Sequence, residues 1–205
     1  MAELRPDLAV IAAHVEPASR VLDIGCGDGA LMLALREKGC DVRGVEIDGA
    51  CVERCVSQGL SVVQGDADRD LADYPDRAFD YTVLSQTLQT AARPDRMLDQ
   101  LLRVGARAFV SFPNFAHWRT RGALMFGGRM PVTRAIPVSW YETTNIHHVT
   151  IKDFRDLARE KNARIEREWF FAGERAIGAV GANGRAEFAV FELSSETNRS
   201  APNNA

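Results

Sequence analysis

The sequence contains no run of about 18 apolar residues, the length that a membrane-spanning helix requires. It also lacks the pattern of a signal peptide, which has a basic start, an apolar segment and a small-residue cleavage site. Its first residues instead include two acids and a proline, Glu3, Asp7 and Pro6. These absences predict a cytoplasmic protein with no membrane partner.

Cysteine and histidine are scarce, with four residues of each type. No Cys-x-x-Cys pair occurs, and no histidine lies near the cysteines in the sequence, so a zinc site would lack ligands. The adjacent His147 and His148 would point to opposite sides of an extended chain. We therefore expect no metal site, and free thiols in a reducing compartment. The cysteines all lie in the first third of the chain, at Cys26, Cys40, Cys51 and Cys55.

Acidic residues slightly outnumber basic ones, and the formal net charge is −3. An acidic chain is a poor electrostatic match for nucleic acid, so no nucleic-acid partner is expected. Residues 113–150 depart from this balance, because Glu142 is the only acid among them. The basic side chains of this stretch are Arg119, Arg121, Arg129 and Arg134.

Apolar residues make up 46% of the 205 positions, which suits one globular domain. Short apolar runs that predict strands alternate with segments whose apolar residues recur at helical spacing. This alternation favours an α/β fold, a doubly wound parallel sheet with helices on both faces. The predicted strands are residues 20–24, 41–47, 60–64, 79–84 and 107–112. The predicted helices are residues 6–15, 30–38, 48–58 and 68–73, and one that begins at Pro94.

The alternation stops at Pro113. Residues 113–149 hold several prolines, glycines and large aromatic residues without clear periodicity, and such a segment inside a compact domain is usually functional. A capping-box pattern at Thr150 then predicts a helix over residues 150–161. Two strands follow at 164–172 and 187–193, joined as a hairpin by the glycine-rich residues between them. We expect one domain over residues 1–193 and a disordered polar tail over 194–205.

A glycine-rich loop, DIGCGDG, begins at Asp23, where the first strand meets the next helix. Gly25 and Gly27 permit a tight turn and a close approach of a ligand to the backbone. The same glycines fit the weak dinucleotide pattern, but the carboxylates of Asp23 and Asp28 would repel a pyrophosphate. They would attract the sulfonium and ammonium groups of S-adenosylmethionine, which is therefore the favoured ligand. A dinucleotide, and a tight turn without a ligand, are the alternatives.

Two further carboxylates follow the next strands. Glu46 ends the second strand, where it could accept hydrogen bonds from both hydroxyls of a ribose. Asp66 follows the third strand and could accept from the adenine amine, although a turn-forming aspartate is the simpler explanation of Asp66 alone. Open α/β sheets bind ligands at these strand ends. The predicted cofactor-binding residues are Asp23, Gly25, Cys26, Gly27, Glu46, Ile47, Asp66, Ala67 and Ser85.

At these residues the chain resembles the class I S-adenosylmethionine-dependent methyltransferases. That resemblance implies a Rossmann-like sheet of seven strands with the last one antiparallel, and S-adenosylmethionine or S-adenosylhomocysteine as the cofactor. Five strings are more specific: VLSQTLQ at 83–89, SFPNF at 111–115, GRMP at 128–131, WYET at 140–143 and NIH at 145–147. They resemble the MetW family of methionine biosynthesis proteins. This closer resemblance implies a role in bacterial methionine biosynthesis and a partnership with a homoserine O-acyltransferase.

No catalytic residue is identifiable, but methyl transfer depends largely on holding donor and acceptor in line. Gln86 and Gln89, after the fourth strand, suit positioning more than proton transfer. The Asn/Asp-Pro-Pro-aromatic motif of amide and adenine methyltransferases is absent there, which excludes that substrate class. His117 is either a general base or a histidine of a surface loop. The substrate or partner candidates are Gln86, Gln89, Asn114, His117, Arg119 and Arg121.

Two functions are consistent with these residues. In the first, the protein binds S-adenosylmethionine, the downstream product of the pathway, and supports the acyltransferase. In the second, it is an active small-molecule methyltransferase with an unknown acceptor. Because arginine and aromatic residues are enriched at protein interfaces, we expect Arg119 and Arg121 to lie at the cofactor mouth or on the face that meets the acyltransferase. A solvated loop with incidental charge is the alternative.

Overall fold

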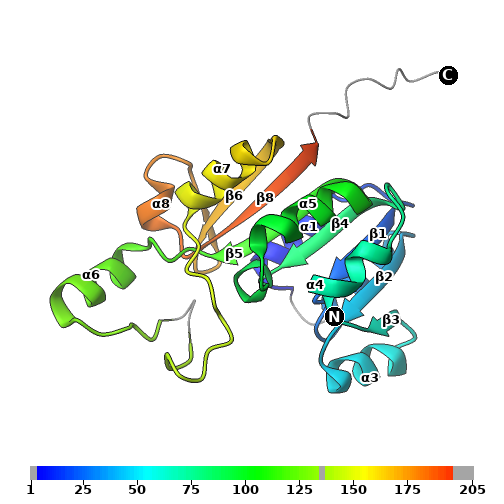
Figure 1. Ribbon diagram of the computed structural model, residues 1–205, viewed down its shortest axis with the longest axis horizontal. Helices are drawn as coiled ribbons and strands as arrows, with labels where there is room; N and C mark the ends of the chain where they lie inside the picture. The colour runs from blue at the N-terminus through cyan, green and yellow to red at the C-terminus, as the bar shows by residue number, and fades with distance from the viewer. Residues whose placement is uncertain (1–3, 134–136, 196–205) are drawn as a thin grey trace.

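The computed structural model describes residues 4–133 and 137–195, and its centre is a mixed β-sheet (Figure 1). Within these residues the sheet has eight strands in the order β3-β2-β1-β4-β5-β8-β6-β7. The first five strands of this order pair in parallel. β8 is antiparallel to both of its neighbours, and β7 is antiparallel to β6. The predicted α/β class, with its parallel half and antiparallel closing strand, is confirmed.

The strands of the parallel half lie close to their predicted positions. They are β1 (Arg20–Ile24), β2 (Asp41–Glu46), β3 (Ser61–Gln64), β4 (Phe79–Ser85) and β5 (Gly105–Pro113). The remaining strands are β6 (Ala163–Ala172), β7 (Arg175–Ile177) and β8 (Phe188–Ser195). β1 to β5 are short apolar runs because helices cover both faces of the parallel part of the sheet.

The helices of the described residues fill the connections. They are α1 (Pro6–His14), α2 (Ala30–Glu37), α3 (Gly49–Ser57), α4 (Ala67–Asp70), α5 (Pro94–Val104), α6 (Trp118–Gly127), α7 (Ile151–Glu160) and α8 (Ala182–Arg185), with the 3₁₀ turns η1 (Leu71–Asp73) and η2 (Leu88–Thr90). Helical spacing of apolar residues predicted α5, which buries Met97, Leu98, Leu101 and Val104. The Thr150 side chain accepts a hydrogen bond from the Asp153 N–H and caps α7, as predicted.

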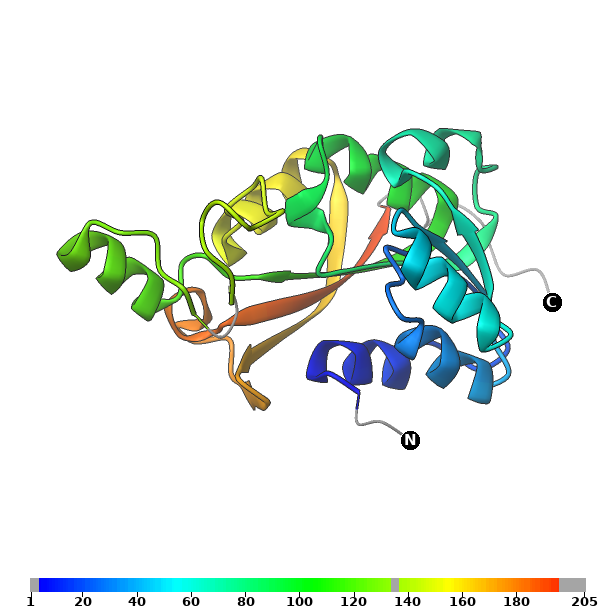
Figure 2. The same cartoon turned by 90° about the horizontal axis from the view of Figure 1, so that it is seen from below.

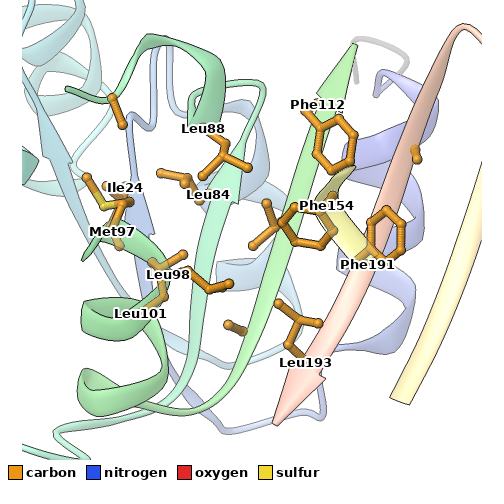
Figure 3. Close-up of a cluster of buried hydrophobic side chains, with 14 of the residues drawn as sticks. Ile24, Leu84, Leu88, Met97, Leu98, Leu101, Phe112, Phe154, Phe191 and Leu193 are labelled. Atoms are coloured by element: carbon orange, nitrogen blue, oxygen red, sulfur yellow. The ribbon is translucent and has the colours of Figure 1, made fainter. Parts of the chain in front are cut away.

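The sheet separates two hydrophobic clusters. α1 and α2 lie on one face and α5 and α7 on the other, as Figure 2 shows. The cluster under α5 and α7 includes Phe112, Phe154 and Phe191, whose rings meet at centroid distances of 4.6–5.7 Å (Figure 3). Apolar side chains from both halves of the chain therefore meet under these helices, which ties the antiparallel strands to the parallel half.

Three parts of the chain differ from the prediction or lie outside it. β6 and β8 do pair antiparallel, but β7 and α8 stand between them, so they are not a simple hairpin and the sheet has one strand more than expected. The segment 113–149, predicted without periodicity, contains the ten-residue helix α6. Arg134 and nearly all of the predicted tail, residues 196–205, lie outside the described residues.

Candidate functional site

A cavity of about 560 Å³ opens at the carboxyl ends of β1 and β4. Open α/β sheets bind ligands at this edge, where parallel strands end and their helices begin. The cavity is lined by the β1–α2 loop, by the start of α1 and by the residues that follow β4. Its lining residues are Leu4, Arg5, Leu8, Asp23, Gly25, Cys26, Gly27, Asp28, Ala30, Leu31, Arg54, Ser85, Gln86 and Thr87.

The two glycines of the loop have different physical roles. Gly25 has a φ of +70°, and a Cβ there would lie 2.6 Å from Thr87 Oγ1, so a side chain would collide with the β4 end. Gly27 has a φ of +57°, but a Cβ there would meet no atom within 4 Å. Gly25 is therefore required by packing, while Gly27 leaves open space beside the cavity.

Asp23 is the buried carboxylate of the cavity. Its residue is 2% exposed, and no hydrogen bond from the described residues reaches its carboxylate. Burial raises the pKa of Asp23 to about 7, the charge of Glu46 adds to this rise, and the charge of Arg5 opposes it. A buried carboxylate without partners is costly, and a cationic ligand group would remove that cost.

Glu46, at the end of β2, organises the glycine loop. One carboxylate oxygen accepts a hydrogen bond from Gly27 N at 2.8 Å, and the other accepts from Ile47 N at 2.9 Å and Asp48 N at 3.0 Å. Glu46 is thus tied to the loop rather than pointing freely into the cavity. A carboxylate has about four acceptor sites, so a ribose hydroxyl could still bind there, and this role stays a prediction.

The structure does not bring Asp66 and Ala67 into the cavity lining. Asp66 caps α4 by accepting a hydrogen bond from Asp68 N at 3.0 Å, which is the turn role considered from the sequence. Ala67 begins α4 and packs against the hydrophobic core. Their contact with adenine stays a prediction.

Ser85 lines the cavity within a cluster that the sequence analysis missed. The hydroxyls of Ser85 and Ser111 both donate to Asp7 Oδ2, at 2.8 and 3.0 Å. Asp7 is 2% exposed, and Arg5 Nη2 donates both to it and to Ser85 Oγ, at 3.1 Å each. This network holds the start of α1 over the ends of β4 and β5. The one sequence signal was Ser111, a polar residue inside the apolar run of the fifth strand.

Gln86 lines the cavity, and Gln89 lies behind it. Gln86 has a φ of +54°, which its backbone bond to Ser111 O at 2.9 Å helps to hold. Gln89 is buried, its Nε2 donates to Gln86 O at 2.6 Å, and its Oε1 has no hydrogen-bond partner within the described ranges. The Gln89 carbonyl accepts from Ile146 N and His147 N, so the segment before α7 packs against this corner.

Asn114 and His117 lie outside the cavity lining. The Asn114 amide donates to Asn183 O and Ala186 O and accepts from Ala116 N and Ile151 N, so its amide group is used within the fold. His117 is 7% exposed, and burial lowers its pKa. A buried neutral histidine differs from the surface-loop histidine that was considered as an alternative, and no described contact connects it to the cavity.

Arg119 and Arg121 are exposed on α6 and do not line the cavity. The Arg119 guanidinium lies 5.3 Å from the centroid of the Trp118 ring. Of the two predicted placements, the cofactor mouth is therefore not the one observed. Their contact with a protein partner stays a prediction.

Two searches of the described residues returned nothing. No group of three or more His, Cys, Asp or Glu side chains in the part of the chain that the structure describes could hold a metal ion. No helix within residues 4–133 and 137–195 is long and apolar enough to cross a membrane.

The strand order, the antiparallel β8 between β5 and β6, and the glycine loop after β1 define the fold of the class I S-adenosylmethionine-dependent methyltransferases. A solved S-adenosylmethionine-dependent methyltransferase from Mesorhizobium loti has this fold, with a TM-score of 0.69 over 91% of this chain and 95% of that one. The two sequences are 18% identical, so this likeness shows the fold alone.

Within that class, the chain belongs to the family of the methionine biosynthesis protein MetW, whose profile matches residues 5–193. The bifunctional methionine biosynthesis protein MetXA/MetW of Rhodopirellula baltica is 33% identical over 178 residues, 82% of this chain and 29% of that protein. A ubiquinone biosynthesis O-methyltransferase of Xylella fastidiosa is 33% identical over 129 residues, 58% of this chain and 51% of that protein. The chain thus spans about half or less of these relatives. The predicted family, and with it the role in methionine biosynthesis, is confirmed.

The affinity of the cavity for S-adenosylhomocysteine should rise with pH up to about pH 7. Asp23 must lose its proton to hold the ligand ammonium, and its pKa in the free protein is raised to about 7. Below that value, each pH unit should therefore weaken binding about tenfold. Calorimetry across this range measures the slope. Asp23→Asn should bind weakly and without the slope, and a flat profile for the wild-type protein would contradict the assignment.

Gly27→Val should abolish binding of S-adenosylhomocysteine, because the new side chain enters the open space beside the cavity. Gly39→Val is the matched control, since Gly39 also has a positive φ and also has no atom within 4 Å of a built Cβ, but it does not line the cavity. Both variants should fold, as judged by circular dichroism, and only Gly27→Val should lose binding in calorimetry. Equal affinity in a folded Gly27→Val protein would show that no ligand approaches this glycine.

Proposed function

We propose that this protein binds S-adenosylmethionine, or S-adenosylhomocysteine, in the cavity at the β1 and β4 ends and supports a homoserine O-acyltransferase in methionine biosynthesis. The observation that carries the first part is Asp23, a buried carboxylate that lines the cavity without a hydrogen-bond partner from the described residues. A phosphate ligand would add negative charge beside it, whereas a cationic ligand would neutralise it.

The residues around Asp23 fit this cofactor. The loop at Gly25 and Gly27 lets the backbone come close to a ligand, and Glu46 shapes the loop through its three backbone hydrogen bonds. When bound, S-adenosylmethionine supplies an electrophilic methyl group on its sulfonium. None of the residues that line the cavity is a histidine or a lysine, so no basic side chain of these types is available there to remove a proton from an acceptor. This favours a binding and regulatory role.

The partner is proposed from the family. The Rhodopirellula baltica relative is named as a bifunctional MetXA/MetW protein, and this chain matches 29% of it. Two functions carried by one chain favour a functional association where they are carried by two. MetX denotes homoserine O-acyltransferase, which activates homoserine early in the pathway, and S-adenosylmethionine lies downstream. A protein that binds the product and contacts the early enzyme would suit regulation.

The partnership should be detected by capture from a native lysate followed by an acyltransferase assay. The captured acyltransferase should be more active with this chain than without it, and S-adenosylmethionine should change that activity. Asp23→Asn is the control, because it should retain the partner but lose the response to S-adenosylmethionine. If the acyltransferase is neither captured nor changed in activity, the proposed role is wrong.

The surface that we propose for the partner is the insert arm, residues 118–133 and 137–146. In Figures 1 and 2, α6 projects away from the sheet. Only Thr120 of its ten residues is buried, while Met125 is 73% exposed and Phe126 is 83% exposed. Trp140 and Tyr141 are each 71% exposed. Exposed apolar groups of this density, beside arginines, are typical of protein interfaces.

Phe126→Glu should weaken binding of the acyltransferase by about 30-fold or more, the loss expected from an interface hot spot. Arg119→Glu combined with Arg121→Glu should also weaken it. Val56→Glu is the matched control, because Val56 is 56% exposed on α3, outside the arm. Affinity is measured by biolayer interferometry, and all variants should bind S-adenosylhomocysteine as the wild-type protein does. If the arm variants and the control bind the acyltransferase equally well, the arm is not the docking surface.

An active methyltransferase with a small-molecule acceptor is the second candidate. It is favoured by Gln89 Oε1, a buried acceptor atom with no partner among the described residues, close behind Gln86 of the cavity. Such an atom could orient the hydroxyl or amine of an acceptor. Transfer of a labelled methyl group to a compound in the same lysate would select this candidate.

A further inference from the structure

Arg5 is the residue before α1, and its position follows from the sequence. Pro6 is the first residue of the helix, and a residue that precedes proline is restricted to extended conformations. Arg5 accordingly has a φ of −54° and a ψ of 147°, which directs the chain into α1 at the edge of the cavity. Arg5 and Asp23 both line this cavity.

The Arg5 guanidinium is oriented by a buried partner. Its Nε and Nη2 donate to the two carboxylate oxygens of Asp7 at 3.2 and 3.1 Å, which is a bidentate arrangement, and Nη2 also donates to Ser85 Oγ. Asp7 is itself held by the hydroxyls of Ser85 and Ser111. A planar guanidinium that is fixed on one edge keeps its remaining donors in a fixed direction.

Arg5 also has binding capacity left. No hydrogen bond from Nη1 to the described residues is found, and the Arg5 side chain is 57% exposed. Its charge acts on Asp23, because it opposes the rise in the pKa of that carboxyl. One cavity therefore presents a cation with free donors and, within electrostatic reach, an anion with free acceptors.

A ligand group that satisfies both must carry an anion and a cation close together. An α-amino acid group does so, because its carboxylate and its ammonium stand on one carbon atom. We infer that Arg5 and Asp23 together bind the zwitterionic amino-acid end of an adenosyl ligand, Arg5 the carboxylate and Asp23 the ammonium. This inference rests on the proposed binding of S-adenosylmethionine and names the residues that select that ligand over adenosyl compounds without a carboxylate.

A purely structural role for Arg5 makes a different prediction. If Arg5 only anchors α1 through Asp7, its loss should loosen the cavity for every adenosyl ligand alike. If Arg5 holds the carboxylate, its loss should weaken only ligands that have one. Decarboxylated S-adenosylmethionine separates these cases, because it keeps the sulfonium and the ammonium but lacks the carboxylate.

The test is calorimetry of wild-type protein and Arg5→Gln with S-adenosylmethionine and with decarboxylated S-adenosylmethionine. A hydrogen-bonded charge pair accounts for about tenfold or more in affinity. The wild-type protein should therefore prefer S-adenosylmethionine by about tenfold or more, and Arg5→Gln should lose this preference while binding the decarboxylated compound unchanged. Arg5→Lys, which keeps the charge without the fork, should restore part of the preference.

Arg54→Gln is the matched control. Arg54 also lines the cavity, from α3, but it is not among the charges that act on Asp23. It should retain the preference for the carboxylate. The inference is overturned if Arg5→Gln weakens both ligands equally or neither, or if Arg54→Gln has the same selective effect. If wild-type protein binds neither compound, the proposed cofactor itself is wrong, and the inference fails with it.

Discussion

Three carboxylates are buried at the edge of the sheet where the parallel strands end, and each needs partners there because a bare buried charge is costly. Asp7 has the hydroxyls of Ser85 and Ser111 and the Arg5 guanidinium. Glu46 has three backbone N–H groups of the loops it joins. Asp23 has no hydrogen bond from the described residues. The first two interactions hold the walls of the cavity, and the third leaves a requirement that a cationic ligand can meet.

The parts of this arrangement that depend on local pattern could be predicted from the sequence. β1, its glycine loop and Glu46 follow from apolar runs and from the position of polar residues at strand ends, and they lie within one residue of their predicted positions. Asp7 could not be assigned in this way. It meets Ser85 and Ser111 across 78 and 104 residues of sequence, and no local spacing encodes a contact of that separation.

The helix α6 was missed for a different physical reason. Periodicity in a sequence reports which side of a helix is buried, and α6 buries only Thr120. A ten-residue helix with so little burial gains little stability from packing, and short isolated helices are marginal in water. Its exposed Met125 and Phe126 are therefore unfavourable for the isolated chain. Their presence is understandable if another protein covers them.

The cavity and the insert arm are attached to the same strand. Ser111 of β5 belongs to the network at the cavity, and Asn114, which follows β5 directly, fixes the approach to α6. The Asn114 amide makes four hydrogen bonds, to residues before and in α7 and around α8, so the root of the arm is held on several sides. A partner on the arm would accordingly sit at a set distance from the cavity. A ligand could then act on such a partner directly across their shared edge, without a movement of the arm.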